Sequence, residues 1–179
     1  EYVTLVNVGQ LNRSEIAELV EIIQQHDPGV LVVDVLFNSV HHINYYDSIG
    51  TARLKSAFDK CSTLVVASIL HEKSESSSDR YDSIEWSSTL LLDTAISGYS
   101  NLRNWPSMSK GSTTAPEIKA VRSFVPSYII DGKRQLALSV ETCIRYLEEK
   151  AIDGSDATTY ASAKRTLDRL KAGDGTPQI

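Results

Sequence analysis

The chain has 179 residues, of which 41% are hydrophobic and 23% are charged, so it is long enough to bury the core of one ordinary domain. Its formal net charge of −5 excludes a general electrostatic attraction to nucleic acid or to an anionic membrane, which would need clustered lysine and arginine. Two cysteines, Cys61 and Cys143, lie far apart without a CxxC motif. We expect both to be small buried hydrophobic residues on helices, not partners in a disulfide or a thiolate metal site.

Hydrophobic runs in the sequence are short. None reaches the roughly 18 to 20 apolar residues that a membrane-spanning helix needs, and the N-terminus lacks the basic and apolar regions of a signal peptide. We therefore expect no membrane-spanning segment within residues 1–179.

A strand and a helix are predicted at the start of the chain. Residues 2–8, YVTLVNV, form a β-branched run closed by Gly9, which is typical of a strand. From Ser14 onward, apolar residues recur at spacings of three and four, and this period predicts an amphipathic helix. Ser14 or Asn12 is the expected N-cap, and the helix is expected to stop before the DPG breaker at residues 27–29.

The most hydrophobic stretch follows this breaker. Val30 to Phe37, VLVVDVLF, predicts a central strand buried on both faces inside a parallel sheet. Its one carboxylate, Asp34, would then need a partner, because an unpaired charge in such a place costs several kcal/mol. The first strand, the helix and this second strand together predict a right-handed βαβ unit.

A loop, a short helix and a third strand come next. Residues 38–50, NSVHHINYYDSIG, have no steady period and predict a loop. Thr51 to Asp59 predicts a short helix, and Ser62 to Leu70, STLVVASIL, repeats the pattern of a buried parallel strand. Residues 73–83 are charged and rich in serine, which is typical of a surface excursion.

The middle of the chain carries weaker signals. Residues 88–96 fit either a helical turn or a strand, residues 97–102 predict a short strand, and residues 103–117 predict a loop. Alternating apolar residues at 119–130 favour one or two antiparallel strands, followed by a turn at Asp131-Gly132.

Helices are predicted towards the C-terminus. Leu136 to Lys150 has apolar residues at helical spacing with charges on the far side, and after a break at residues 153–156 a polar surface helix is predicted at residues 157–170. The elements together predict a three-layer α/β/α domain at residues 1–152, with a mixed sheet that is parallel at its centre and antiparallel at one side. Residues 153–179 are the expected connector.

The order of these segments resembles the CHASE type 2 family, the cyclase/histidine-kinase-associated sensory extracellular domains of bacteria. The match spans roughly residues 3–148. The residues that carry the resemblance are Val33 to Phe37, Asp47, Leu54, Ala57, Leu64 to Ala67, Gly98 to Leu102, and Val121-Arg122 ahead of Val125-Pro126. The segment from Gly9 to Arg13 is too short to hold the Trp-Pro and Arg rich segment that family members commonly carry.

The resemblance implies an extracytoplasmic input domain without catalytic activity. It implies that a transmembrane segment before Glu1 and others after Ile179 anchor the parent protein, with the output module across the membrane. The expected partner is an unknown small ligand or protein, and no nucleic acid, metal or other cofactor is expected. The helix at residues 157–170 is interpreted as a transmitter, as a homodimer contact, or as a passive connector.

A candidate site lies after the predicted central strand, because ligands of open parallel sheets bind at the carboxyl ends of the strands. The candidate ligand-binding residues are Asp34, Asn38, His41, His42, Tyr45, Asp47 and Arg122. These groups suit a pocket for a small polar ligand or a metal. Alternatively, Asp34 and Asp47 pin the loop through hydrogen bonds to backbone amides, and Arg122 either pairs with one of them or points to solvent.

Signals for a metal site or for catalysis are weak. His41 and His42 are adjacent and point apart in an extended segment, so they do not form a metal site by themselves. The sequence contains no GxSxG or HExxH motif. The rival interpretations are a small α/β hydrolase or phosphotransfer-type enzyme that uses Asp34 and Asp47, and a structural interaction domain.

Overall fold

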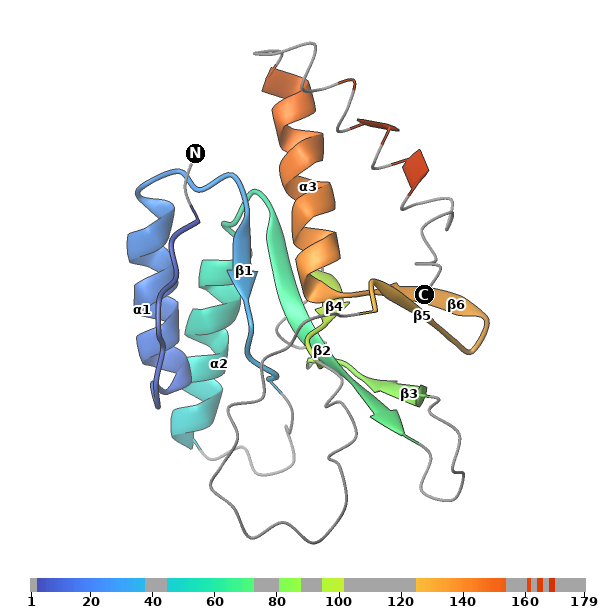
Figure 1. Cartoon of the computed structure of the whole chain (residues 1–179). Helices are drawn as coiled ribbons and strands as arrows, with labels where there is room; N and C mark the ends of the chain where they lie inside the picture. Colours follow the sequence, from blue (N-terminus) through green and yellow to red (C-terminus); the bar gives the residue numbers. More distant parts are fainter. Residues whose placement is uncertain are drawn as a thin grey trace, which may run out of the picture.

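The computed structural model describes residues 3–37, 45–72, 81–87, 95–101 and 125–153, together with five exposed helical residues between 161 and 169. The longer helices are α1 (Arg13–Gln24), α2 (Tyr45–Phe58) and α3 (Leu138–Asp153). The strands are β1 (Leu31–Val33), β2 (Leu64–Glu72), β3 (Tyr81–Glu85), β4 (Ile96–Tyr99), β5 (Ser127–Ile130) and β6 (Lys133–Leu136), arranged as Figure 1 shows.

The main sheet is organised around β2. Val65 of β2 lies opposite Val32 of β1 and opposite Ile96 of β4, and both pairings are parallel, so β1 and β4 flank β2 on its two edges. The second half of β2 pairs antiparallel with β3, where Leu70 lies opposite Ile84. The sheet is therefore mixed, with parallel strands at its centre.

Helices cover both faces of this sheet. Val66 packs into a core shared with Ile16 of α1 and Leu54 of α2, whereas Val65 packs with Leu138 of α3. The two directions follow from the pleat of the strand, which sends successive side chains to opposite faces. The predicted α/β fold, with helical layers on both sides of a mixed sheet, is confirmed.

The Val30 to Phe37 run does not form the central strand. Three of its residues form β1, which among the described strands pairs with β2 alone. Val32 is 37% exposed, and Asp34 lies beyond the end of the strand in an exposed position. The prediction of a central strand with a buried acid is therefore wrong. β2 takes the centre because it has parallel partners on both edges. Its composition is similar to that of the Val30 to Phe37 run, so composition alone did not show which of the two is central.

The first predicted strand is also absent from the described residues 3–8. Val3 and Leu5 are 91% and 92% exposed, so their side chains make little contact with the rest of the domain. Asn7 accepts a hydrogen bond from the amide of Gly9, whose φ of +51° turns the chain towards α1. The βαβ unit that the structure contains is instead formed by β1, α2 and β2.

The start of α1 follows a local sequence signal. Asn12 Oδ1 accepts from the amide of Glu15 at 3.1 Å, and Glu15 Oε2 accepts from the amide of Asn12 at 2.7 Å. This capping box satisfies two amides that the helix itself leaves unpaired. Of the two expected N-caps, Asn12 is therefore the one that is used.

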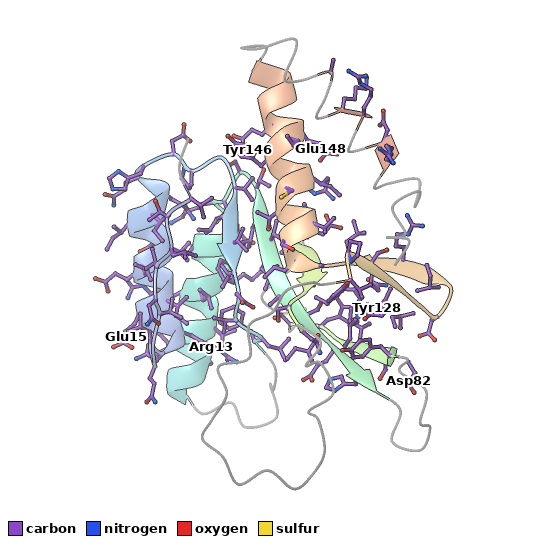
Figure 2. All side chains as sticks on the ribbon, in the orientation of Figure 1. Arg13, Glu15, Asp82, Tyr128, Tyr146 and Glu148 are labelled. Atoms are coloured by element: carbon purple, nitrogen blue, oxygen red, sulfur yellow. The ribbon has the colours of Figure 1, made fainter. Side chains whose placement is uncertain are left out.

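The start of α2 follows a tertiary contact. The helix begins at Tyr45, so the predicted loop is wrong over residues 45–50. A β-carbon at Gly50 would lie 3.2 Å from Cβ of Arg13, and Arg13, labelled in Figure 2, donates to Thr51 Oγ1 at 2.7 Å. Packing on α1 at Gly50 and Thr51 thus stabilises the helix at a glycine, which is a weak helix former.

A strand replaces the end of the predicted surface excursion. β3 begins at Tyr81, so the expectation for residues 81–83 is wrong, while residues 73–80 lie outside the described part of the chain. After β3, the buried hydroxyl of Ser87 accepts from the amide of Phe37 at 3.0 Å and donates to the carbonyl of Ala67 at 3.3 Å. This side chain therefore ties the backbone that leaves β1 to the middle of β2.

The later elements agree better with the sequence. β4 confirms the strand expected at residues 97–102, and the turn at Asp131-Gly132 is confirmed by φ values of +50° and +71° in the β5–β6 hairpin. β6 itself was not expected, and α3 begins at Leu138 instead of Leu136. Most of the polar helix at residues 157–170 lies outside the described residues, and its separation from the domain stays a prediction.

Candidate ligand-binding groove

The residues of the predicted site are not brought together in the described part of the chain. Asp34 is exposed beyond β1, while the backbones of Tyr45 and Asp47 lie in the first turn of α2 and their side chains are not described. The other candidates, Asn38, His41, His42 and Arg122, lie outside the described residues. A pocket at the carboxyl ends of the strands therefore stays a prediction.

A groove of about 450 Å³ lies at the opposite end of the sheet, beside the first residues of β2 and β4. One wall is the turn that connects α2 to β2, and the other wall is the second half of α3, which rises past the amino ends of β1 and β2 in Figure 1. The lining residues are Phe58, Cys61, Ser62, Thr63, Leu64, Ile96, Arg145, Glu148 and Glu149. This volume is in the range of sites for small molecules.

The groove has an apolar floor from the end of α2 and the first residues of β2 and β4, and the turn between α2 and β2 adds small polar groups. Phe58, Leu64 and Ile96 are the apolar members, and Ser62 and Thr63 add hydroxyls at the point where the chain enters β2. A smaller hollow of about 120 Å³ lies on the other side of the same turn and shares residues 61–63 with the groove. The turn is therefore hollowed on both of its sides.

Cys61 is held in this turn as a thiol. Gln24 Nε2 donates to its sulfur at 2.9 Å, and Cys61 Sγ lies 3.6 Å from the carbonyl of Ala57, to which it donates. Burial raises the pKa of the Cys61 thiol, although the hydrogen bond from Gln24 acts in the opposite direction. A protonated thiol is a poor nucleophile, so Cys61 acts here as a packed polar contact. Cys61 is half-buried, so the prediction that it is buried is confirmed in part. Cys143 is exposed, so the same prediction is wrong for Cys143.

The α3 wall carries the charges of the groove. Arg145 donates from Nη1 to Glu148 at 2.7 Å and from Nη2 to Glu141 at 3.3 Å. Its Nε atom is buried without a hydrogen-bond partner among the described residues. Glu148, labelled in Figure 2, is one third exposed, and Glu141 is only 14% exposed. The charged side of this helix, predicted opposite its apolar residues, is therefore only partly exposed, and Arg145 and Glu148 line the groove.

Glu149 completes this wall. Its Oε2 atom is buried without a hydrogen-bond partner among the described residues, and it lies against the backbone of Gly29. A β-carbon at position 29 would approach this oxygen to 2.6 Å, so glycine leaves the space that the carboxylate occupies. The Pro28-Gly29 turn is thereby packed against the second half of α3.

The charges give the groove a negative balance. Two carboxylates and one guanidinium line it, and the guanidinium is already paired with Glu148 and with Glu141. The carbonyl end of α3 adds partial negative charge on the same side. In the described part of the chain, no cluster of three or more His, Cys, Asp or Glu side chains could hold a metal ion. The groove is suited to an organic ligand that is neutral or positively charged.

The groove was not predicted from the sequence. Its walls come from residues 58–64, 96 and 145–149, which lie far apart along the chain and carry no joint motif. The only local signal is the series of charges at Arg145, Glu148 and Glu149, and such a series is more often a solvated helix face.

Comparisons of the chain with models of protein families, with curated proteins and with solved structures give no match. Among the helices that the structure describes, none combines the length and the hydrophobicity needed to cross a bilayer. A functional assignment therefore rests on the residues and the geometry of the chain itself.

Proposed function

We propose that the chain is a non-catalytic sensory domain of the CHASE type 2 kind, which binds a ligand outside the cytoplasm for a membrane-anchored bacterial signalling protein. The observation that supports this proposal is the ordered series of segments from Val33-Asp34 through Gly98 to Val125-Pro126. An α/β domain with a groove for a small molecule suits such a role. The ligand, or a partner protein, is not identified by the fold.

A sensor needs a ligand that binds two conformations unequally. The groove provides a place for this because its two walls belong to different elements, the α2–β2 turn and α3. The second half of α3 projects past the sheet in Figure 1, whereas the first half of the helix contacts the core at Leu138, Val140 and Ile144. A ligand that bridges the two walls would change the position of α3, which leads into the C-terminal part of the chain.

The parent polypeptide tests this proposal directly. We expect it to contain transmembrane segments on both sides of residues 1–179 and a kinase or cyclase module beyond them. Alkaline phosphatase fused at Lys150 should be active in a bacterial host, whereas green fluorescent protein fused there should not fluoresce after export through the Sec route. A parent protein without any bilayer-crossing segment, or a cytoplasmic location of Lys150, contradicts the proposal.

A further inference from the structure

We infer that the groove between the α2–β2 turn and the second half of α3 binds a small organic cation, an amine with an apolar body. As an account of what the domain senses, this inference rests on the proposed sensory function. The groove lies at the amino ends of β2 and β4, so it is distinct from the site predicted at the carboxyl ends of the strands.

Arg145 does not make the groove a site for anions. Both terminal nitrogens of its guanidinium already donate to carboxylates, one to Glu148 and one to Glu141. Nε carries one further N–H, which is buried and has no hydrogen-bond partner among the described residues. A carboxylate or phosphate ligand would therefore meet a compensated cation and would be repelled by Glu148 and Glu149.

Glu149 is the charge that remains to be matched. No described residue donates to its buried Oε2 atom, and a buried carboxylate oxygen without a donor is unfavourable. The oxygen lies against Gly29, and because it is the far end of a flexible side chain it can move away from this position. Rotation of this side chain turns the carboxylate into the groove that Glu149 already lines, where an ammonium group supplies the missing donor.

The remaining lining residues favour a cation that also carries an apolar group. Ile96 is half-buried, and the edges of Phe58 and Leu64, which are 3% and 8% exposed, complete the apolar part; an aromatic or aliphatic body packed there is removed from water. The hydroxyls of Ser62 and Thr63 lie on the wall that faces α3, where they can accept hydrogen bonds from a ligand. The ligand that fits a negatively charged wall beside an apolar surface is an amine with an apolar group.

The test uses three probes of similar shape and different charge. Binding of 2-phenylethylamine, 2-phenylethanol and 3-phenylpropionate to the full chain is measured by titration, following backbone amide signals by NMR. We expect the amine to bind most tightly and to shift the amides of Ser62, Thr63 and Ile96, with the anion weakest. Glu149→Gln should weaken amine binding about tenfold, which corresponds to the loss of one charge-assisted hydrogen bond. The control Glu18→Gln removes an exposed carboxylate of α1 and should leave the affinity unchanged.

Three results would overturn the inference. The first is equal or tighter binding of 3-phenylpropionate, and the second is amine binding whose affinity or amide shifts do not depend on Glu149. The third is binding of none of the three probes, while the topology of the parent protein still decides the sensory function. Conversely, amine binding by a chain whose parent lacks transmembrane segments would keep this site and remove the proposed sensory role.

Discussion

The side-chain amide of Asn101 pairs with both backbone groups of Leu70. Asn101 Nδ2 donates to the carbonyl of Leu70 at 2.7 Å, and the amide of Leu70 donates to Asn101 Oδ1 at 2.7 Å. The preceding backbone bond, from the amide of Ser100 to the carbonyl of Ser68, continues the pairing of β4 with β2. A side chain thus extends the edge of the sheet where the backbone of β4 no longer does, which satisfies two polar groups of a residue that is only 2% exposed.

Replacement of Asn101 by alanine should destabilise the domain by about 2–3 kcal/mol, because both backbone groups of Leu70 lose their partner. Urea unfolding measures the loss. Asn101→Asp should cost a similar amount, because a carboxylate keeps the acceptor but cannot donate to the carbonyl of Leu70. The neighbouring change Ser100→Ala keeps its backbone bond and serves as the control. Unchanged stability of Asn101→Ala would show that these two bonds contribute little.

Two glycines offer a matched pair of alanine substitutions. At Gly98 a β-carbon would lie 2.6 Å from Cα of Leu138, which is backbone, and at Gly29 it would lie 2.6 Å from the flexible end of Glu149. Gly98→Ala should therefore cost about 2–3 kcal/mol by forcing α3 away from β4, whereas Gly29→Ala should cost less than about 1 kcal/mol. Urea unfolding of both variants checks this. Equal losses of stability in the two variants would mean that the backbone of Leu138 moves aside as easily as the side chain of Glu149.

Asp34 is expected to be replaceable without loss of stability. Its side chain is exposed beyond β1, so Asp34→Asn should change the free energy of unfolding by less than about 0.5 kcal/mol. A large destabilisation would indicate a buried partner that the described residues do not show. If the chain were instead a hydrolase or phosphotransfer enzyme that uses Asp34, the same variant would abolish turnover while the fold remained intact.

Cys61 should give the domain a component of alkaline instability. Burial raises the pKa of its thiol in the folded state, so above the ordinary thiol pKa the unfolded chain has lost a proton that the folded chain still holds. The resulting stability is present at lower pH and declines as the pH rises through the folded value. Cys61→Ser should reduce this decline in urea unfolding measured between about pH 8 and pH 10.

Cys143 provides a comparison of accessibility, because it is exposed. Iodoacetamide should alkylate Cys143 of the native chain faster than Cys61. If the slope of stability against pH were identical in Cys61→Ser and in the natural chain, Cys61 would not cause the alkaline loss of stability.

Several features of the fold follow from local signals. The capping box of Asn12 and Glu15, the Asp131-Gly132 turn, and the apolar period of α3 depend on residues close together in the sequence. Such interactions form wherever those residues occur, so the helices, the turn and the α/β class were predictable. The β2 segment was also predictable, because a Val-rich run of this length suits a strand with both faces buried.

Other features depend on partners that are distant in the sequence. Two Val-rich runs have similar composition, and only the pairing of β2 with both β1 and β4 decides which one lies at the centre. Near its start, α2 packs on α1 at Gly50 and Thr51, and this contact supports a helix at a glycine with weak helix propensity.

The sequence by itself therefore determined the three longer helices in part, the β2 and β4 strands, the Asp131-Gly132 turn and the class of the fold, because these depend on periodicity and on short-range hydrogen bonds. The tertiary structure alone decided which strand is central and where the groove lies. The groove exists because chain folding places the charged end of α3 opposite the α2–β2 turn, and no short-range pattern records a contact between segments so far apart.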